Sequence, residues 1–198
     1  MRVSDAELMG LYAEIEAAGK SGEYRRYREV LRSTVRDICG RLRFVPSRSE
    51  VDCLAESLGS WQPFPDTVDA LERMKNRYRL CIVSNVDDDL FAGTARTLGV
   101  DFDYVVTAEQ VGSYKPSHNN FAMAVERLGI QKESVLHVAE SVKLDIVAAK
   151  GFGMDAVWVN RHSGTGREGS ASGNPSDGDS GADMEVPDLK TLAELMGL

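Results

Sequence analysis

The chain has few cysteines, no long hydrophobic run and no basic stripe, and each absence excludes a class of protein. Its 198 residues include only Cys39, Cys53 and Cys81. An odd number of widely spaced cysteines is typical of reduced thiols inside a cell and leaves no zinc framework. No run approaches the roughly 20 apolar residues of a membrane span, and the amino terminus lacks the apolar segment of a secretory signal. We therefore expect a cytoplasmic protein that does not enter a membrane.

The charge balance is acidic. Lysine and arginine number 23 and aspartate and glutamate 31, which gives a formal charge of −8. A local basic cluster alternates with acidic residues, which favours a solvated helix face; it consists of Arg25, Arg26, Arg28, Arg32 and Arg36. This balance predicts no nucleic-acid partner.

Residues 1–59 carry a helical pattern with no strand. Ser4 can cap a first helix with Glu7 as its capping-box partner, and Ser47 or Ser49 opens a third helix. Apolar residues recur between them at helical spacing. We interpret residues 1–59 as an accessory helical cap or a small helical bundle.

After Trp61, apolar strands alternate with amphipathic helices. Predicted strands cover residues 80–84, 102–107, 135–139 and 156–159, and predicted helices cover 88–98, 117–128 and 142–151. This alternation indicates an α/β fold with a parallel sheet, and the continuous apolar strands indicate that helices cover both faces. We place a Rossmann-like core at residues 60–162.

The carboxyl-terminal part of the chain divides in two. Residues 163–183 are rich in glycine, serine and aspartate without a large apolar side chain. Such a segment cannot bury enough surface to offset its ordering entropy, so we expect a disordered insertion at 163–184. Residues 185–198 are expected to return to the core as a strand and a helix.

Three polar clusters follow the predicted strands in a fixed order. Ser84 and Asn85 end one strand, Lys115 follows a turn, and Glu140 and Asp145 follow a later strand. Ligands of open α/β sheets bind beyond the carboxyl ends of the strands. A hydroxyl, an amide, a lysine and two carboxylates at those ends predict a site that handles an anion.

Each cluster taken alone also has a structural interpretation. Ser84 and Asn85 can hold an anion or merely turn the chain. Lys115 can neutralise developing charge or lie on the surface. Glu140 and Asp145 can share Mg²⁺ or position a water molecule. Alternatively, they can cap a helix whose dipole stabilises their negative charge. Their succession favours the functional interpretation.

The motifs together resemble the haloacid dehalogenase superfamily, and most closely its type II 2-haloacid dehalogenase-like branch. They are Trp61-Gln-Pro-Phe-Pro-Asp66, Ile82-Val-Ser-Asn85, Tyr114-Lys-Pro116, His137-Val-Ala-Glu-Ser141 and Val157-Trp-Val-Asn-Arg161. The resemblance spans residues 61–161, and the helical block resembles that branch's cap. It implies a hydrolase with a Rossmann-like core that acts on a small anionic substrate. A homodimer is compatible with it, since members of the branch often dimerise.

The resemblance also implies roles for individual residues. An aspartate at the end of the family's first strand displaces halide to form an ester, or attacks phosphorus with Mg²⁺ bound. Ser84 and Asn85 would hold the substrate anion, and Lys115 would stabilise the nucleophile. Asp145 would orient the hydrolytic water or hold a metal. Phe121 takes the position of a substrate-side tyrosine.

The fourth motif separates this chain from the dehalogenases of the branch. Glu140 and Val142 stand where these carry serine and asparagine. The pair of Glu140 and Asp145 is closer to the phosphatase arrangement. We therefore expect no cofactor for a dehalogenase, and Mg²⁺ at Glu140 and Asp145 for a phosphatase. His137 lies inside a predicted strand and is interpreted as a core residue.

Nothing in residues 1–79 looks like the family's central first strand with its aspartate. We expect that Met1 is not the natural start, and that the chain as printed is inactive because the nucleophile is missing. The alternatives are a catalytically degenerate protein that binds an anion or a partner, and a magnesium-dependent small-molecule phosphatase.

Overall fold

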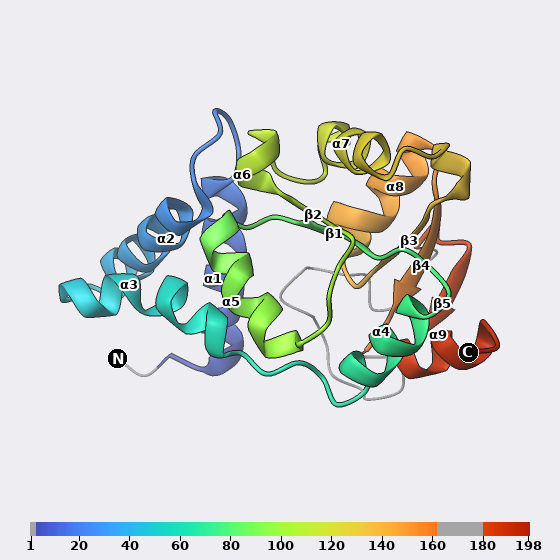
Figure 1. Cartoon of the computed structure of the whole chain (residues 1–198). Coiled ribbons are helices and arrows are strands. Elements are labelled where there is room, and N and C mark those ends of the chain that lie inside the picture. The colour runs from blue at the N-terminus through green and yellow to red at the C-terminus, as the bar shows by residue number, and fades with distance from the viewer. Residues whose placement is uncertain (1–2, 162–179) are drawn as a thin grey trace.

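The computed structural model describes residues 3–161 and 180–198, and in this part of the chain a helical layer lies beside an α/β core (Figure 1). The layer consists of α1 (Asp5–Gly19), α2 (Tyr27–Arg41) and α3 (Arg48–Ser57). As predicted, Ser4 opens the first helix with a capping box to Glu7, and Ser47 opens the third with one to Glu50. A short 3₁₀ turn, η1 (Leu58–Ser60), leads into the core.

The core contains the predicted alternation of strands and helices. Its strands are β1 (Cys81–Ser84), β2 (Tyr104–Thr107), β3 (Leu136–Ala139), β4 (Asp155–Val159) and β5 (Met184–Val186). Its helices are α4 (Thr67–Lys75), α5 (Asp88–Leu98), α6 (Ala108–Val111), α7 (His118–Leu128), α8 (Val147–Phe152) and α9 (Leu189–Leu195), with a 3₁₀ turn η2 (Lys132–Ser134) and a π-helical turn η3 (Val142–Ile146). The α/β fold class is confirmed.

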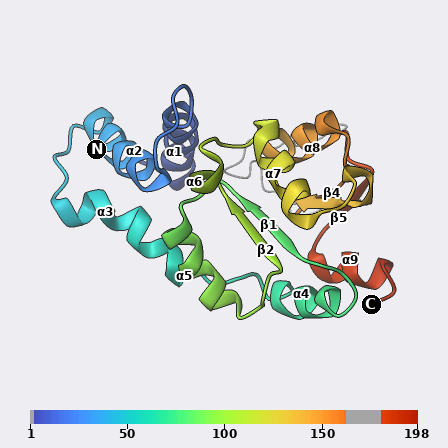
Figure 2. The same ribbon diagram turned by 45° about the horizontal axis from the view of Figure 1, so that its top comes forward.

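The described strands form two parallel sheets. β1 pairs with β2, and β4 lies between β3 and β5. No ladder joins β1 to β3 within the described residues. Figure 2 shows the β1–β2 pair apart from β4 and β5.

β4 is the most completely enclosed strand. Ala156 and Trp158 pack into one apolar cluster with Phe121 of α7, while Val157 and Val159 pack into another with α4 and α9. Side chains of a strand alternate between the faces of its sheet, so each face of β4 is covered by helices. This explains why its sequence is a continuous apolar run.

One ion pair ties three elements of the core together. Arg161, just after β4, donates from its two Nη atoms to Asp66 at 2.8 and 3.1 Å, and Leu189 N donates to the same carboxylate at 2.9 Å. Burial raises the pKa of Asp66, but Arg161 and the Leu189 amide outweigh it and hold the pKa below its ordinary value. The carboxylate thus joins α4 to β4 and to the start of α9.

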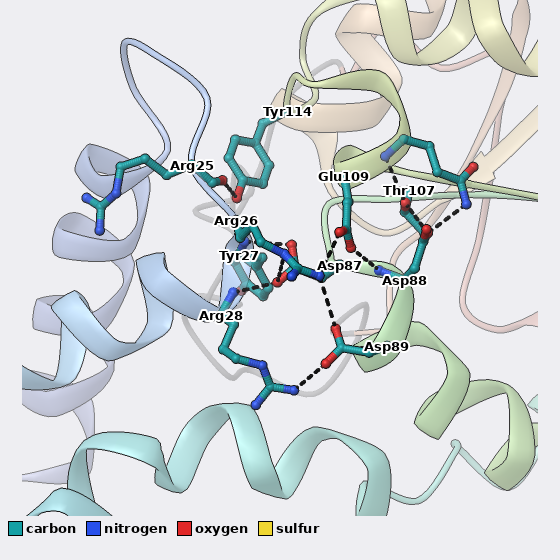
Figure 3. Close-up of polar contacts among 11 residues, drawn as sticks. Arg25, Arg26, Tyr27, Arg28, Asp87, Asp88, Asp89, Thr107, Glu109 and Tyr114 are labelled. Carbon is teal, nitrogen blue, oxygen red and sulfur yellow. Dashed lines mark hydrogen bonds and ion pairs between the residues drawn. The ribbon is translucent and has the colours of Figure 1, made fainter.

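The helical layer meets the core through charged residues (Figure 3). Asp87 is fully buried and accepts the amide hydrogens of Tyr27 and Arg28 at 2.8 and 2.9 Å. It therefore caps α2, although it precedes α5. Arg26 pairs with Glu109 at 2.6 Å, and Arg28 pairs with the exposed Asp89 at 2.6 Å. Arg26 and Arg28 are thus solvated, with side chains 52% and 30% exposed, and they also pair with acidic residues of the core.

The expected insertion near the carboxyl terminus is largely outside the described part of the chain. The predicted insertion at 163–184 lies outside the described residues except for its last five positions, and β5 begins at Met184.

In the part of the chain that the structure describes, no helix has the length and apolar character needed to span a membrane.

Candidate active site

The predicted polar clusters meet at the carboxyl ends of β1 and β3, beside a cavity of about 930 Å³. Both strands line it along their length. Of the six residues singled out from the sequence, five line this cavity, namely Ser84, Lys115, Phe121, Glu140 and Asp145. The topology thus brings together side chains from four separate segments.

Lys115 connects β1 to the π-helical turn η3 that follows β3. Its Nζ atom donates to the backbone carbonyl of Val83 at 2.9 Å and lies 2.5 Å from Oδ1 of Asp145. The side chains of Lys115 and Asp145 are 11% and 8% exposed, so the pair is largely removed from water. The ammonium group is therefore fixed by two partners, and Lys115 is not a surface lysine.

Asn85 contacts the backbone of Lys115. Its Oδ1 accepts the Lys115 amide hydrogen at 2.7 Å, and its Nδ2 donates to the Lys115 carbonyl at 3.2 Å. This two-point contact fixes the loop that carries the lysine. Asn85 does not line the cavity, so in this structure it positions Lys115, while Ser84 faces the cavity.

His137 belongs to the site, which the sequence argument missed. Its Nε2 lies 2.9 Å from Oδ1 of Asp145, and its ring packs edge-on against Phe121 at 5.1 Å between centroids. Phe121 is fully buried. The sequence feature that could have indicated this role is a histidine inside an otherwise apolar strand that is followed by Glu140 and Asp145.

Asp145 is a buried carboxylate that contacts both Lys115 and His137. It lies in the π-helical turn η3, whose first turn is capped by the hydroxyl of Ser141. Burial raises the pKa of Asp145, but the Lys115 ammonium and the contact with His137 outweigh burial and leave the pKa below its ordinary value. Asp145 is therefore an anion above acidic pH and neutralises Lys115.

The depressed pKa of Asp145 predicts acid sensitivity. A carboxyl group whose folded-state pKa lies below about 3.9 stabilises the protein above that pH, and this contribution is lost as the pH falls through the folded-state value. We expect the free energy of unfolding to decrease below about pH 4, and to decrease less steeply in Asp145→Asn. Urea unfolding between pH 3 and 7 measures both slopes.

The control for this experiment is Asp101→Asn, which alters an exposed aspartate. It should leave the acid-dependent slope unchanged. Equal slopes for the parent protein and Asp145→Asn would contradict the assignment.

The donor set for a divalent ion is incomplete in the described residues. No group of three histidine, cysteine, aspartate or glutamate side chains comes together in these residues. Oδ1 of Asp145 already contacts Lys115 and His137. Glu140 lines the same cavity and its backbone carbonyl accepts from Trp158 Nε1 at 2.9 Å. We derive no step through a metal.

A buried lysine–aspartate pair thus lies at the carboxyl ends of parallel strands, where ligands of open α/β sheets bind. The model of the haloacid dehalogenase-like hydrolases matches residues 6–153. The chain belongs to that family.

Relatives and solved structures agree with this assignment. The chain is 27% identical over 146 residues to an (S)-2-haloacid dehalogenase of Pseudomonas putida, a match that covers 72% of this chain and 64% of that protein. It is 35% identical over 102 residues to a glyceraldehyde 3-phosphate phosphatase of Methanothermobacter thermautotrophicus, over 50% of this chain and 45% of that one. The structure of an L-2-haloacid dehalogenase from Xanthobacter autotrophicus superposes with a TM-score of 0.81 at 21% identity, and covers 96% of this chain and 86% of that one.

Proposed function

We propose that the chain forms the substrate site of a hydrolase for small anionic substrates. The substrate class that we propose first is the 2-haloacids. The observation that carries the proposal is the fixed ammonium group of Lys115, which lies at the cavity with Ser84 and is held by Asn85 and Asp145. The relatives that share the motifs include an (S)-2-haloacid dehalogenase, which supports this substrate class.

The proposed reaction requires a carboxylate nucleophile. One of its oxygens bonds to the carbon that bears the halogen as the carbon–halogen bond breaks, and halide leaves with the bonding pair. Water then attacks the acyl carbon of the ester, which restores the carboxylate and releases the hydroxyacid and a proton. Lys115 stabilises the attacking carboxylate, and Ser84 donates to the substrate anion.

The described strands do not supply this nucleophile. They end in Ser84, Thr107, Ala139, Val159 and Val186. Asp145 is paired with Lys115 and lies in a helical turn. We therefore propose that the described residues bind the substrate anion without turning it over.

Calorimetry with 2-chloropropionate tests the anion site. We expect binding in the parent protein and about 10- to 150-fold weaker binding in Ser84→Ala, because the loss of one hydrogen bond to a charged group costs about 1.5–3 kcal/mol. The control is Ser60→Ala, since Ser60 lies in η1 away from the cavity. Binding that is equal in both variants and the parent would contradict the role of Ser84, and absence of binding would contradict the site.

A phosphatase is the second candidate. The similarity to a glyceraldehyde 3-phosphate phosphatase and the presence of Glu140 beside Asp145 at the cavity favour it. Phosphate binding that appears only with Mg²⁺, and that is lost in Glu140→Gln, would support this candidate over a dehalogenase.

A further inference from the structure

A second cavity lies in the helical layer, between α1 and α2, which pack side by side (Figure 2). Its volume is about 500 Å³, which is in the range of small-molecule sites in proteins. Among the described residues it shares no lining side chain with the cavity at Lys115. Its polar lining consists of Glu14, Arg25, Ser33, Arg36, Asp37 and Arg41. The proposed function does not use this cavity.

Arg25 and Arg36 form a basic end of the α1–α2 cavity. Nη2 of Arg25 donates to the Glu29 carbonyl at 3.3 Å and lies 3.2 Å from Ser33 Oγ, and Figure 3 shows its guanidinium group directed away from Tyr114. Arg36 has no hydrogen-bond or ion-pair partner within the described residues. Side chains of a helix lean toward its amino terminus, so Arg36 leans toward Ser33. Two guanidinium groups therefore meet here without a carboxylate between them.

Glu14 and Asp37 form an acidic end of the same cavity. Arg41 donates from Nη1 and Nη2 to Glu14 at 3.2 and 2.8 Å, which joins α2 to α1. Glu14, and more weakly Asp37, raise the pKa of Arg41, so two carboxylates share one guanidinium group. Ser33 and Arg41 are eight residues apart in α2, which corresponds to about 12 Å along the helix axis. The cavity is thus electrically polarised along its length.

The surface between the two ends is apolar and open. Ile15, Ala18 and Gly19 of α1 and Gly40 of α2 line it. A Cβ atom at Gly40 would meet no other residue within 4 Å. Glycine is a poor helix former, and no close neighbour requires it at this position. Its effect in the structure is to leave space in the cavity.

We infer that the α1–α2 cavity binds a small zwitterion, with a carboxylate at the basic end, an ammonium group at the acidic end and a short aliphatic chain over the apolar surface between them. Guanidinium groups bind a carboxylate through paired, charge-assisted hydrogen bonds. The acidic end has one carboxylate more than it has cations, which suits a single ammonium group. A simple anion or a simple amine would satisfy only one end.

Two-dimensional NMR of the whole chain with 6-aminohexanoate tests this inference. The amide signals of Gly19 and Gly40 report on the α1–α2 cavity, and that of Ser84 reports on the cavity at Lys115. We expect saturable shifts of the two glycine signals. Shifts confined to Ser84 would place the probe in the other cavity and overturn the inference.

Two further probes test the need for both charges. Hexanoate keeps the carboxylate and hexylamine keeps the ammonium group, and we expect each to bind about tenfold more weakly than 6-aminohexanoate. Equal affinity of either probe would overturn the zwitterion as the ligand.

Matched variants assign the two ends. Arg36→Met and Asp37→Asn should each weaken binding of 6-aminohexanoate about tenfold. The control is Arg77→Met, which removes an exposed arginine after α4, outside the cavity, and should leave the affinity unchanged. Unchanged affinity in Arg36→Met or Asp37→Asn would contradict the assignment of that end.

Gly40→Leu tests the cavity without removing a charge. Leucine is a better helix former than glycine and its Cβ atom has room, so we expect the melting temperature to be maintained while binding of 6-aminohexanoate is lost. A folded Gly40→Leu variant with the parent affinity would overturn the site. Ser84→Ala should weaken binding of 2-chloropropionate but leave the 6-aminohexanoate shift of Gly40 unchanged, which separates this inference from the proposed function.

Discussion

Replacing Lys115 with methionine is expected to lower the free energy of unfolding at pH 7 by about 3–5 kcal/mol, the cost of breaking a buried ion pair by removing one partner. Asp145 is 8% exposed in its side chain and would keep only its contact with His137. The same variant should lose binding of 2-chloropropionate. Urea unfolding and calorimetry measure these two effects.

The loss of stability should itself depend on pH. Without Lys115, burial dominates and raises the pKa of Asp145, so the folded variant takes up a proton on the carboxylate as the pH falls. We therefore expect the difference in stability between the parent protein and Lys115→Met to be smaller at pH 4.5 than at pH 7. An equal difference at the two pH values would count against the buried pair.

Two further variants sharpen this result. Lys143→Met removes an exposed lysine of the same helical turn and should change stability by less than about 0.5 kcal/mol. The double variant Lys115→Met with Asp145→Asn should cost less than the sum of the two single changes, because neither group is then left as an unpaired buried charge.

The second large effect is expected at the junction between the helical layer and the core. Asp87→Ala should destabilise the protein by about 2–3 kcal/mol, because it leaves two partly buried amide hydrogens at the start of α2 without their acceptor. These belong to Tyr27 and Arg28. Chemical denaturation measures the loss, and hydrogen exchange should show faster exchange of both amides.

Matched variants make this prediction specific. Asp87→Asn keeps one side-chain oxygen as acceptor and should cost less than alanine. Asp89→Ala removes a neighbouring carboxylate that is 52% exposed and paired with Arg28, and such pairs contribute at most about 1 kcal/mol. If Asp89→Ala were as damaging as Asp87→Ala, the effect would come from the general charge of this surface and not from the helix cap.

The sequence predicted the features that depend on neighbouring residues. Ser4 and Ser47 cap their helices as expected, because a capping box needs only a partner three residues away. The apolar runs predicted the ends of β1 to β4 to within two residues, because buried strands consist of consecutive apolar residues. The order of Ser84, Lys115 and Asp145 also predicted that they lie close together, as they do at one cavity, since parallel strands bring their carboxyl ends to one edge.

Only the tertiary structure decided which polar group meets which. Asp87 directly precedes α5 but caps α2, which begins 60 residues earlier, and Asn85 contacts the backbone of Lys115, 30 residues later. His137 was interpreted as a core residue but contacts Asp145. A carboxylate, an amide or an imidazole can form hydrogen bonds of similar free energy with many different groups. The partner is chosen by which groups the packing of helices and strands brings within hydrogen-bond distance, and local sequence does not contain that information.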